Sequence, residues 1–346
     1  MAEYISFQPS DYFSTVLYTG NQPADNAITG VGFSPNFVWV KNRDATTSNV
    51  LFNTVQGVGK SLYANTDGAE VSDAAGMKSF DADGFTVGDW SQPNTNGDDY
   101  VSWNWKAGTT SGLSGGTITP SSYSINATSG FGIYEYAGTG SNGTIAHGLG
   151  AGNKFLWVKN TSSGGGVNWK CIHSNLASSV ENVYLNLNSA EYGEAATFNS
   201  TFPGDTVFNL GTNAGTNASG NDYIAYLFCS KTGFSKMGTY TGNNNADGTF
   251  VYTGFRPAVI IIKDRTAGNN WAMFDDKRLG YNVDNNTLTP NDNLAESTTD
   301  QIDILSNGFK CRIAHSGING NGNNYVYAAF AEFPIVSSNS KAGVAR

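Results

Sequence analysis

The sequence predicts an all-β protein made of three tandem β-sandwich-like domains, and three observations support this. First, the chain combines 42 glycines and 13% aromatic residues with only 14% charged residues; aromatic residues favour strands, whereas glycine favours tight turns. Second, short apolar segments alternate with turn residues along the chain. Third, a unit of about 100 residues, the usual size of a β-sandwich domain, occurs three times.

Each unit opens with a strand that ends in a turn, and a wholly apolar strand follows. The apolar strand is apolar on both faces, which is typical of a central strand covered on both sides. It reads FVWVKN at 37–42, FLWVKN at 155–160 and VIIIKD at 259–264. A lysine follows a tyrosine by 23 residues in all three units: Lys41 after Tyr18, Lys159 after Tyr136 and Lys263 after Tyr240. The identical spacing indicates three copies of one unit.

Each unit closes with two further strands around a loop rich in glycine and asparagine. The first of them reads DGFTVG at 83–88, TVFNLG at 206–211 and NGFKCR at 307–312. In the closing strand, apolar residues alternate, so one face is expected to point inward. This face comprises Val101, Trp103 and Trp105, then Ile224, Tyr226 and Phe228, then Val326, Ala328 and Phe330.

The repeats define the expected domain organisation. We expect an N-terminal arm at 1–12, β-sandwich repeats at 13–106, 131–233 and 234–334, a Gly/Ser/Thr linker at 107–130, and a C-terminal tail at 335–346. The linker is flexible in composition and has room for one strand. This linker predicts that the first unit moves more freely than the second and third units, which are joined almost without a linker.

Charge and hydropathy exclude several classes of partner. The net charge of −9 argues against nucleic acid, because phosphates recruit clustered lysine and arginine. No run of about 18 apolar residues predicts a membrane span, and the first residues lack the pattern of a signal peptide. We therefore expect synthesis in a cytoplasm, without nucleic-acid or membrane partners. The cysteines, Cys171, Cys229 and Cys311, lie in predicted strands and are expected to be buried, reduced and free of metal.

The segment TVQGVGKS at 54–61 is similar to a phosphate-binding loop but lacks two of its features. That loop needs a glycine five residues before the Gly-Lys-Ser triplet, and Thr54 occupies this position. The loop should also open a helix, and no helical period follows. The other two units do not keep the triplet. We interpret Lys60 as a solvated strand or turn residue.

Other polar residues have both a functional and a structural interpretation. The pairs Asp81/Asp83, Asp98/Asp99 and Asp275/Asp276 could serve as acid and base in glycan cleavage, but their turn contexts favour a structural role. A glutamate recurs in mid-unit at Glu70, Glu191 and Glu296. It would be either a sugar or cation ligand, or a partner of backbone amides or of the recurring lysine; we favour the second interpretation.

Some aromatic residues are candidates for stacking on sugar rings, namely Trp90, Tyr192 and Trp169. Trp169, however, matches a strand position that we assign to Leu51 and Trp271 in the other units, so a core role is favoured.

Several long segments of the chain resemble a known family. They include EYISFQPSDYF at 3–13, MKSFDADGFTVG at 77–88, DDKRLGYNVDNN at 275–286 and AEFPIVSSNSKAGVAR at 331–346. They are similar to a domain of unknown function that recurs in virion structural, tail-fibre-like proteins of tailed marine bacteriophages. The resemblance covers nearly the whole chain. It implies a structural component of the particle and no catalytic residues. From the residues themselves we expect no cofactor and no metal site.

The resemblance and the composition lead to one expected function and two alternatives. We expect a non-enzymatic bacteriophage virion protein, a tail-fibre-like or other surface appendage that contacts the host surface. The alternatives are a capsid decoration protein (a cement or head-fibre protein) and a tail-borne glycan depolymerase. Expected partners are other virion proteins and a host surface glycan or receptor. A homo-oligomer, in particular a trimer, is expected.

The N-terminal arm is the expected contact with the virion or with other copies of the chain. Its candidate contact residues are Tyr4, Ile5, Phe7, Pro9 and Tyr12, which carry more apolar surface than a solvated tail. Pro9 favours an extended backbone that lacks an amide donor. The alternative is that this segment forms the first edge strand of the first unit.

Overall fold

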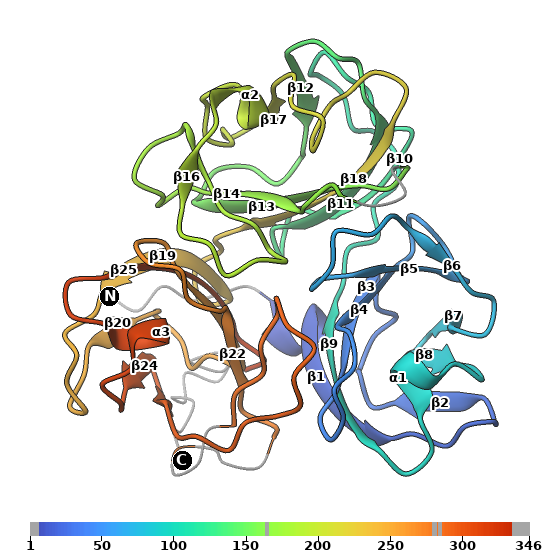
Figure 1. Ribbon diagram of the computed structural model, residues 1–346. Coiled ribbons are helices and arrows are strands. Elements are labelled where there is room, and N and C mark those ends of the chain that lie inside the picture. The colour runs from blue at the N-terminus through green and yellow to red at the C-terminus, as the bar shows by residue number, and fades with distance from the viewer. Residues whose placement is uncertain (1–6, 163–165, 279–281, 283–285, 334–346) are drawn as a thin grey trace.

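The protein is all-β, as the sequence predicts. The computed structural model describes residues 7–162, 166–278, 282 and 286–333. Antiparallel strands form three lobes that meet at a common centre, as Figure 1 shows. The described helices are single turns: the 3-10 helix η1 (Pro9–Asp11), α1 (Ser91–Asn94), α2 (Ala195–Phe198) and α3 (Ser316–Asn319).

The first lobe holds two facing sheets. Its main sheet has six strands in the order β1 (Phe13–Thr19), β9 (Asp99–Trp105), β3 (Phe37–Asn42), β4 (Val50–Asn53), β5 (Lys60–Tyr63) and β6 (Val71–Ser72). The smaller sheet comprises β2 (Asn26–Thr29), β8 (Gly84–Val87) and β7 (Met77–Asp81). Between the sheets, Ile28 and Phe85 of the smaller sheet pack in one buried cluster with Val38, Val40 and Phe52 of the main sheet. This arrangement is sandwich-like.

The second lobe repeats this plan with a shorter second sheet. Its main sheet has the order β10 (Ser122–Asn126), β11 (Phe131–Ala137), β18 (Asp222–Cys229), β13 (Lys154–Asn160) and β14 (Lys170–His173). Two strand pairs accompany it: β12 (Gly143–Ala146) with β17 (Val207–Leu210), and β15 (Glu181–Asn182) with β16 (Tyr192–Gly193). The edge strand β10 comes from the expected linker, and Ile118 and Ile125 of that segment are buried. The linker is therefore packed on the second lobe.

The third lobe has a four-stranded main sheet and a three-stranded smaller sheet. The main sheet has the order β19 (Ser235–Thr241), β25 (Asn324–Phe330), β21 (Val259–Asp264) and β22 (Ala272–Asp275). The smaller sheet comprises β20 (Phe250–Tyr252), β24 (Gly308–Cys311) and β23 (Ile302–Leu305).

Four strands occur in the same order in all three main sheets. They are β1-β9-β3-β4, β11-β18-β13-β14 and β19-β25-β21-β22. The register also agrees, because the recurring lysine of each central strand pairs with the same position of the closing strand: Lys41 with Val101, Lys159 with Ile224 and Lys263 with Val326. The segments that recur in the sequence therefore take equivalent places in the three sheets.

The alternating apolar residues of the closing strands are buried, as expected, but they face the centre of the molecule. Trp105, Phe228 and Phe330, the last residues or nearly so of their strands, contact one another with ring centroids 5.5–5.9 Å apart. The opposite face of each closing strand, which begins with Tyr100 in the first lobe, faces the sandwich of its own lobe. Both faces of these strands are thus buried.

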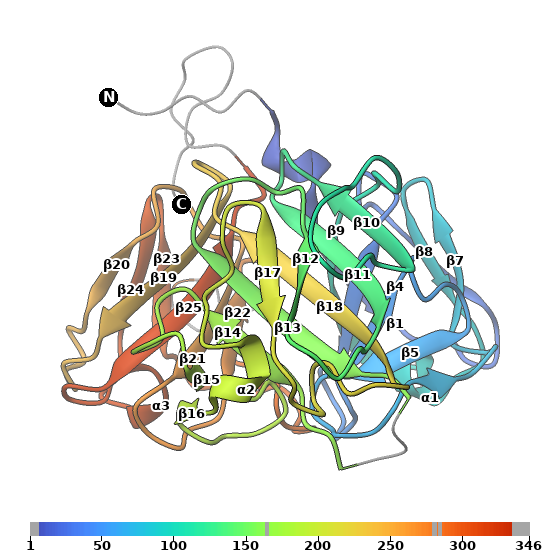
Figure 2. The same ribbon diagram turned by 90° about the horizontal axis from the view of Figure 1, so that it is seen from above.

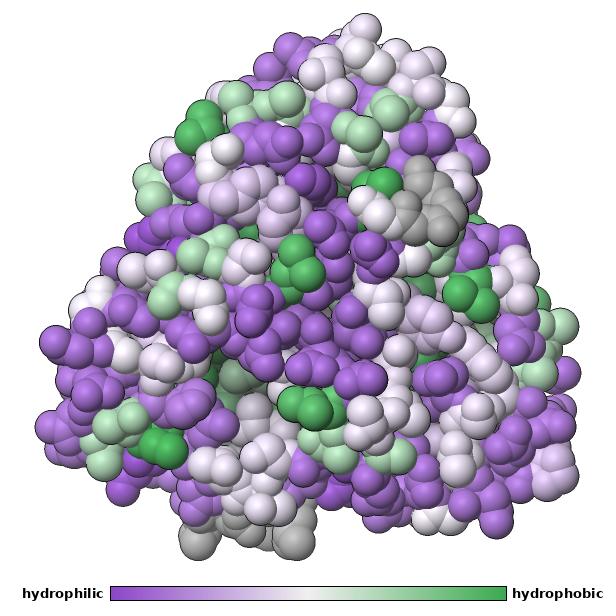
Figure 3. Space-filling view, viewed as in Figure 1, coloured by the Kyte–Doolittle hydropathy of each residue, from purple (hydrophilic) through white to green (hydrophobic). Residues whose placement is uncertain are grey.

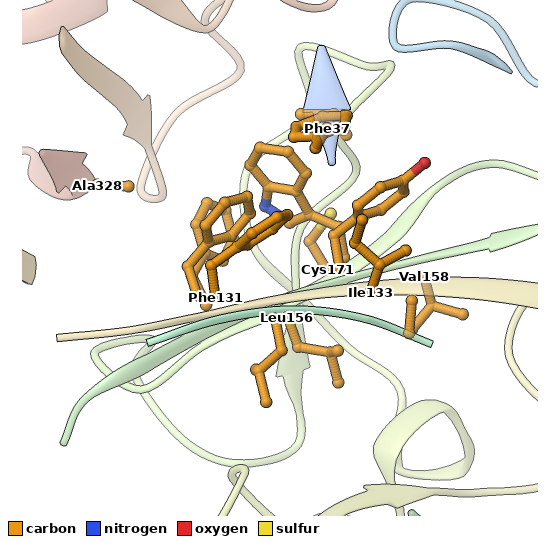
Figure 4. Packing of buried hydrophobic residues seen from close by; sticks show 14 of the residues in the cluster. Phe37, Phe131, Ile133, Leu156, Val158, Cys171 and Ala328 are labelled. Atoms are coloured by element: carbon orange, nitrogen blue, oxygen red, sulfur yellow. The ribbon is translucent and has the colours of Figure 1, made fainter. Parts of the chain in front are cut away.

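The three lobes share one apolar core, which we call the central core. Phe37 of the first lobe lies 4.8 Å from Tyr226 of the second, and Phe13 lies 5.8 Å from Phe330 of the third. Figure 4 shows Phe131, Ile133 and Cys171 on the face of the second sheet towards Phe37 and Ala328, with Leu156 on the other face. The expectation that the first unit moves more freely is therefore wrong, because its largest side chains are buried against the other two lobes.

The two ends of the molecule differ. Figure 2 shows α1, α2 and α3 together at one end, which we call the helix end. At the opposite end lies η1, where the described chain begins and ends. The contact of Trp105 with Phe228 and Phe330 lies at this end too, because Trp105 pairs with Phe13, which closely follows η1. The lysines of the central strands lie near the helix end, because they pair with residues close to the start of each closing strand.

Candidate functional site

Each pair of lobes is joined by the backbone of the recurring glutamate. The amide N–H of Glu70 in the first lobe donates to the carbonyl of Thr161 in the second at 3.3 Å. Glu191 of the second donates likewise to Arg265 of the third at 2.9 Å, and Glu296 of the third to Arg43 of the first at 2.8 Å. Thr161, Arg265 and Arg43 are all two residues beyond the recurring lysine. The three junctions therefore close a ring.

The carboxylates of these glutamates also have structural partners. Glu296 accepts two hydrogen bonds from Arg43 across the junction, at 3.0 and 3.1 Å, and one from Arg278 at 2.9 Å. Glu191 accepts from Arg265 across its junction at 2.5 Å. Arginine suits such contacts because its guanidinium matches a carboxylate in shape. At the remaining junction Thr161 takes the arginine's place, and Glu70 binds within its own lobe.

Lys60 is the ion-pair partner of Glu70. It begins β5, and its ammonium group contacts the Glu70 carboxylate. This agrees with the interpretation of Lys60 as a strand residue and gives it a role that requires no nucleotide. The structural interpretation of the glutamates also holds, although their main partners are arginines and Lys60 instead of the recurring lysine.

The recurring lysines bind backbone carbonyls at the same three junctions. All three are fully buried. The ammonium of Lys41 donates to Asn293 of the third lobe at 3.2 Å, that of Lys159 to Asp67 of the first at 3.0 Å, and that of Lys263 to Asn188 of the second at 2.9 Å. Each also donates to a loop carbonyl of its own lobe.

Burial lowers the pKa of each of these lysines to about 8. Removal from water disfavours the charged form, and the nearest carboxylates, of Asp292, Asp67 and Asp264, only partly offset this effect. The three lysines are therefore ammonium groups held mainly by backbone dipoles, each at the seam between two lobes.

The residues opposite the lysines reach across the same junctions. By register these are Asn49, Trp169 and Trp271. The indole N–H of Trp169 donates to Tyr63 of the first lobe, and that of Trp271 to Tyr184 of the second, both at 2.9 Å. Trp169 is buried, as expected, but its counterpart in the first lobe is Asn49. The assignment of Leu51 to this position was wrong, because Leu51 pairs with Trp39, two positions further along the strand.

A polar pocket of about 410 Å³ lies at the junction of the second and third lobes. Its walls come from the loop after β15 (Asn188), the loop between β21 and β22 (Gly268–Trp271), the segment around Thr287, and α3. The volume falls in the range of small-molecule sites. None of the described residues that line it is an aspartate, glutamate, lysine or arginine, and one of them is His315.

The recurring lysine of the third lobe holds two walls of this pocket. Lys263 donates to the carbonyl of Asn188 on one wall and, at 2.5 Å, to that of Asn269 on another. In the sequence, Lys263 stands out because a lysine recurs at the same position of each unit. The sequence could not indicate the pocket, since the lining residues lie between positions 188 and 318.

The candidate contact residues of the N-terminal arm lie partly in the described chain. Phe7 packs edge-on against Tyr12 and against Phe234, with ring centroids 5.2 and 5.7 Å apart. Pro9 is buried in η1. This part of the arm lies on the junction of the second and third lobes and forms no strand. Tyr4 and Ile5 lie outside the described residues.

The carboxylate pairs occupy structural positions. Asp83 accepts hydrogen bonds from the backbone N–H groups of Gly30 and Gly32, at 3.1 and 2.6 Å. Asp275 accepts from Trp103 of the first lobe at 3.1 Å and from Arg278 at 2.7 Å. Asp276 forms an ion pair with Arg256 at 2.8 Å, and burial raises its pKa to about 7. None of these three carboxylates lines the polar pocket.

Two of the histidines are buried hydrogen-bonding groups. In His147 and His173, Nδ1 accepts a backbone N–H, from Leu149 and Asn175, which leaves the proton on Nε2. Nε2 then donates to the carbonyls of Gly204 and Tyr327, respectively. Burial lowers the pKa of both to about 4, so both are neutral at neutral pH.

Within residues 7–333, leaving out the short gaps, no group of three or more histidine, cysteine, aspartate or glutamate residues has the arrangement of a metal site. The three cysteines are buried and unpaired. None of the helices in the described part of the chain is long and apolar enough to cross a membrane.

Comparison with known families shows that most of the chain matches one family model. The model of a domain of unknown function, DUF7483, matches residues 8–334. A comparison with curated proteins gives no match.

Proposed function

Since the chain belongs to the DUF7483 family, whose function is unknown, we propose from its sequence and structure that it is a non-enzymatic structural protein of a bacteriophage particle. In this proposal it is a tail-fibre-like or other surface appendage that contacts the host. The bacteriophage context comes from the resemblance of its long sequence segments to virion proteins. The structure supports the proposal in one respect: the three lobes form a rigid block whose two ends differ.

The rigidity follows from the central core. Large aromatic residues of all three lobes contact one another there, and the backbone of each lobe is hydrogen-bonded to the next in a closed ring. An extensive apolar interface restrains the relative motion of domains. A subunit that must transmit contact between a particle and a cell surface needs this property.

The two ends of the block differ in where the described chain begins and ends. The described chain begins and ends opposite the helix end (Figure 2). An attachment through the chain termini would therefore leave the helix end free. In the view of Figure 3, which looks onto this end, the surface is mostly hydrophilic and its apolar residues are scattered, singly or in small groups. Such a surface suits polar contacts with a cell envelope.

The experiment is to locate the chain in particles. Antibodies against the recombinant chain are used to label purified particles of the phage that encodes it, for electron microscopy. We expect the label on the tail or another appendage, and we expect the soluble chain to compete with particles for adsorption to host cells. Label on the head alone would favour a decoration protein instead, and absence from purified particles would refute a virion role.

A truncation tests the N-terminal arm separately. Because Phe7 and Tyr12 pack on Phe234, a deletion through residue 12 would disturb the fold, so the deletion should stop at residue 6. Removing residues 2–6 should leave the melting temperature unchanged and prevent incorporation into particles. Replacing the same residues by a Gly/Ser segment of equal length is the matched variant, and normal incorporation of both would refute a role for Tyr4 and Ile5.

A further inference from the structure

The polar pocket between the second and third lobes has the chemistry of a binding site. Its lining includes Gly317 and Ile318 of α3, which lies at the helix end. Its lining carries amide groups from Asn188, Asn270 and Gln301 and hydroxyl groups from Thr287 and Thr289. Trp271 and Ile318 form a small apolar floor that offers little accessible surface, because both residues are almost fully buried. Amides and hydroxyls over a small apolar floor are complementary to a polyhydroxylated ligand.

The described lining contains no carboxylate, lysine or arginine, and this selects the ligand class. The chain as a whole carries a net charge of −9, yet among the described residues of the lining none is acidic and none is a lysine or arginine. An anionic ligand would find no lysine or arginine in the described lining, where the basic side chain is His315, whose Nδ1 already accepts the backbone N–H of Gly317. The ammonium of Lys263 is engaged by the carbonyls of Asn188 and Asn269, and the protein around the pocket is negative. A cationic ligand would find no carboxylate in the lining to pair with. A neutral ligand avoids both penalties.

Several polar groups of the lining have no partner within the described chain. The side-chain amides of Asn188 and Gln301 form no hydrogen bond to any described residue. Thr287 is only 6% exposed, and its hydroxyl has no hydrogen-bond partner among the described residues. Buried polar groups are normally satisfied, so an unsatisfied hydroxyl beside a pocket indicates a group that a ligand could complete.

The pocket is held in shape without a ligand. The ammonium of Lys263 donates to the carbonyls of both Asn188 and Asn269. The indole N–H of Trp271 donates to the carbonyl of Tyr184 of the second lobe. On the third wall, the carbonyl of Thr289 accepts from Asn49 of the first lobe at 3.2 Å. Walls fixed in this way lower the entropy cost of binding.

We propose that this pocket binds a neutral saccharide. The inference rests on the proposed function in one respect, namely that such a saccharide would belong to the host surface. Its test uses the isolated full-length chain, so a failure here leaves the location of the chain in particles untouched, and the particle experiment can fail without affecting this one.

The experiment is saturation-transfer NMR with two panels of ligands. The neutral panel contains glucose, galactose, mannose, N-acetylglucosamine and their common disaccharides. The acidic panel contains glucuronic acid and N-acetylneuraminic acid. We expect saturation transfer to at least one neutral sugar and none to the acidic sugars. Binding of acidic sugars alone, or of no sugar at millimolar concentration, would overturn the proposal.

Variants then assign the binding to the pocket. Gln301→Ala removes one unpartnered amide and should weaken binding about tenfold, the effect of one hydrogen bond to a ligand. Thr287→Val should also weaken binding, yet it should not lower the melting temperature, because the hydroxyl has no partner to lose. The matched control is Asn96→Ala, an exposed asparagine beside α1 at the same end of the molecule. Equal affinity of Gln301→Ala, Thr287→Val and wild-type chains would overturn the assignment.

Discussion

Replacing Trp105 by alanine tests whether the three lobes depend on one core. The Trp105 side chain is 1% exposed. Its ring centroid lies 5.2 Å from that of Phe37 in its own lobe, 5.9 Å from Phe228 of the second lobe and 5.5 Å from Phe330 of the third. The substitution therefore removes contacts with all three lobes at once.

The expected loss of stability follows from the buried area. A buried tryptophan removes about 150–250 Å² from water, which at about 25 cal/mol per Å² corresponds to about 4–6 kcal/mol. Measured substitutions of this kind cost about 3–5 kcal/mol, which is the range we expect. The indole N–H of Trp105 has no hydrogen-bond partner among the described residues, so no hydrogen bond adds to the cost. Trp105→Phe should accordingly be much milder.

The assay combines chemical unfolding with hydrogen exchange. If the core is shared, Trp105→Ala should increase exchange in β18 and β25 as well as in β9. The matched control is Trp90→Ala, because Trp90 is only partly buried and contacts Phe52 and Tyr63 of its own lobe. Its effect should remain in the first lobe. An exchange increase confined to the first lobe in Trp105→Ala, or an unchanged free energy of unfolding, would refute the shared core.

Three further predictions concern titration and nucleotide binding. The free energy of unfolding should fall as the pH drops from 6.5 to 4, because the folded-state pKa of His147 and His173, about 4, lies below the unfolded value of 6.5. Each histidine contributes up to about 3 kcal/mol to this fall, and the His173→Gln variant should show a smaller fall in urea titrations. Between pH 8 and 10 the free energy of unfolding should rise, since the unfolded chain then still holds protons that Lys41, Lys159 and Lys263 have lost in the folded protein. Lys263→Met should reduce this rise by about a third, and an equal rise in wild type and variant would contradict the assignment. Finally, ATP with magnesium should leave the melting temperature unchanged, because the ammonium of Lys60 already contacts Glu70. A ligand bound at one hundred times its Kd would instead add about 2.7 kcal/mol to the free energy of unfolding. A shift of the melting temperature that Lys60→Ala abolishes would restore the nucleotide interpretation.

The sequence alone determined the fold class and much of the local structure. Alternating residues such as Trp103 and Trp105 predicted a buried strand face, and the doubly apolar segment at 37–42 predicted a central strand; both are confirmed. Glycine and asparagine marked the turns. These features were predictable because side-chain direction in a strand has a period of two, so the pattern of apolar residues reports burial directly.

Only the tertiary structure decided what covers each buried face. A period of two shows that Trp105 is buried, but it does not show that Phe228 and Phe330, from other repeats, bury it. For the same reason the linker at 107–130 suggested a mobile first unit, although that unit is held in the central core. Lys263 was conspicuous by its recurrence, yet its role depends on the carbonyl of Asn188, 75 residues away along the chain. The polar pocket likewise depends on loops from two lobes, and contacts between distant segments leave no periodic trace in the sequence.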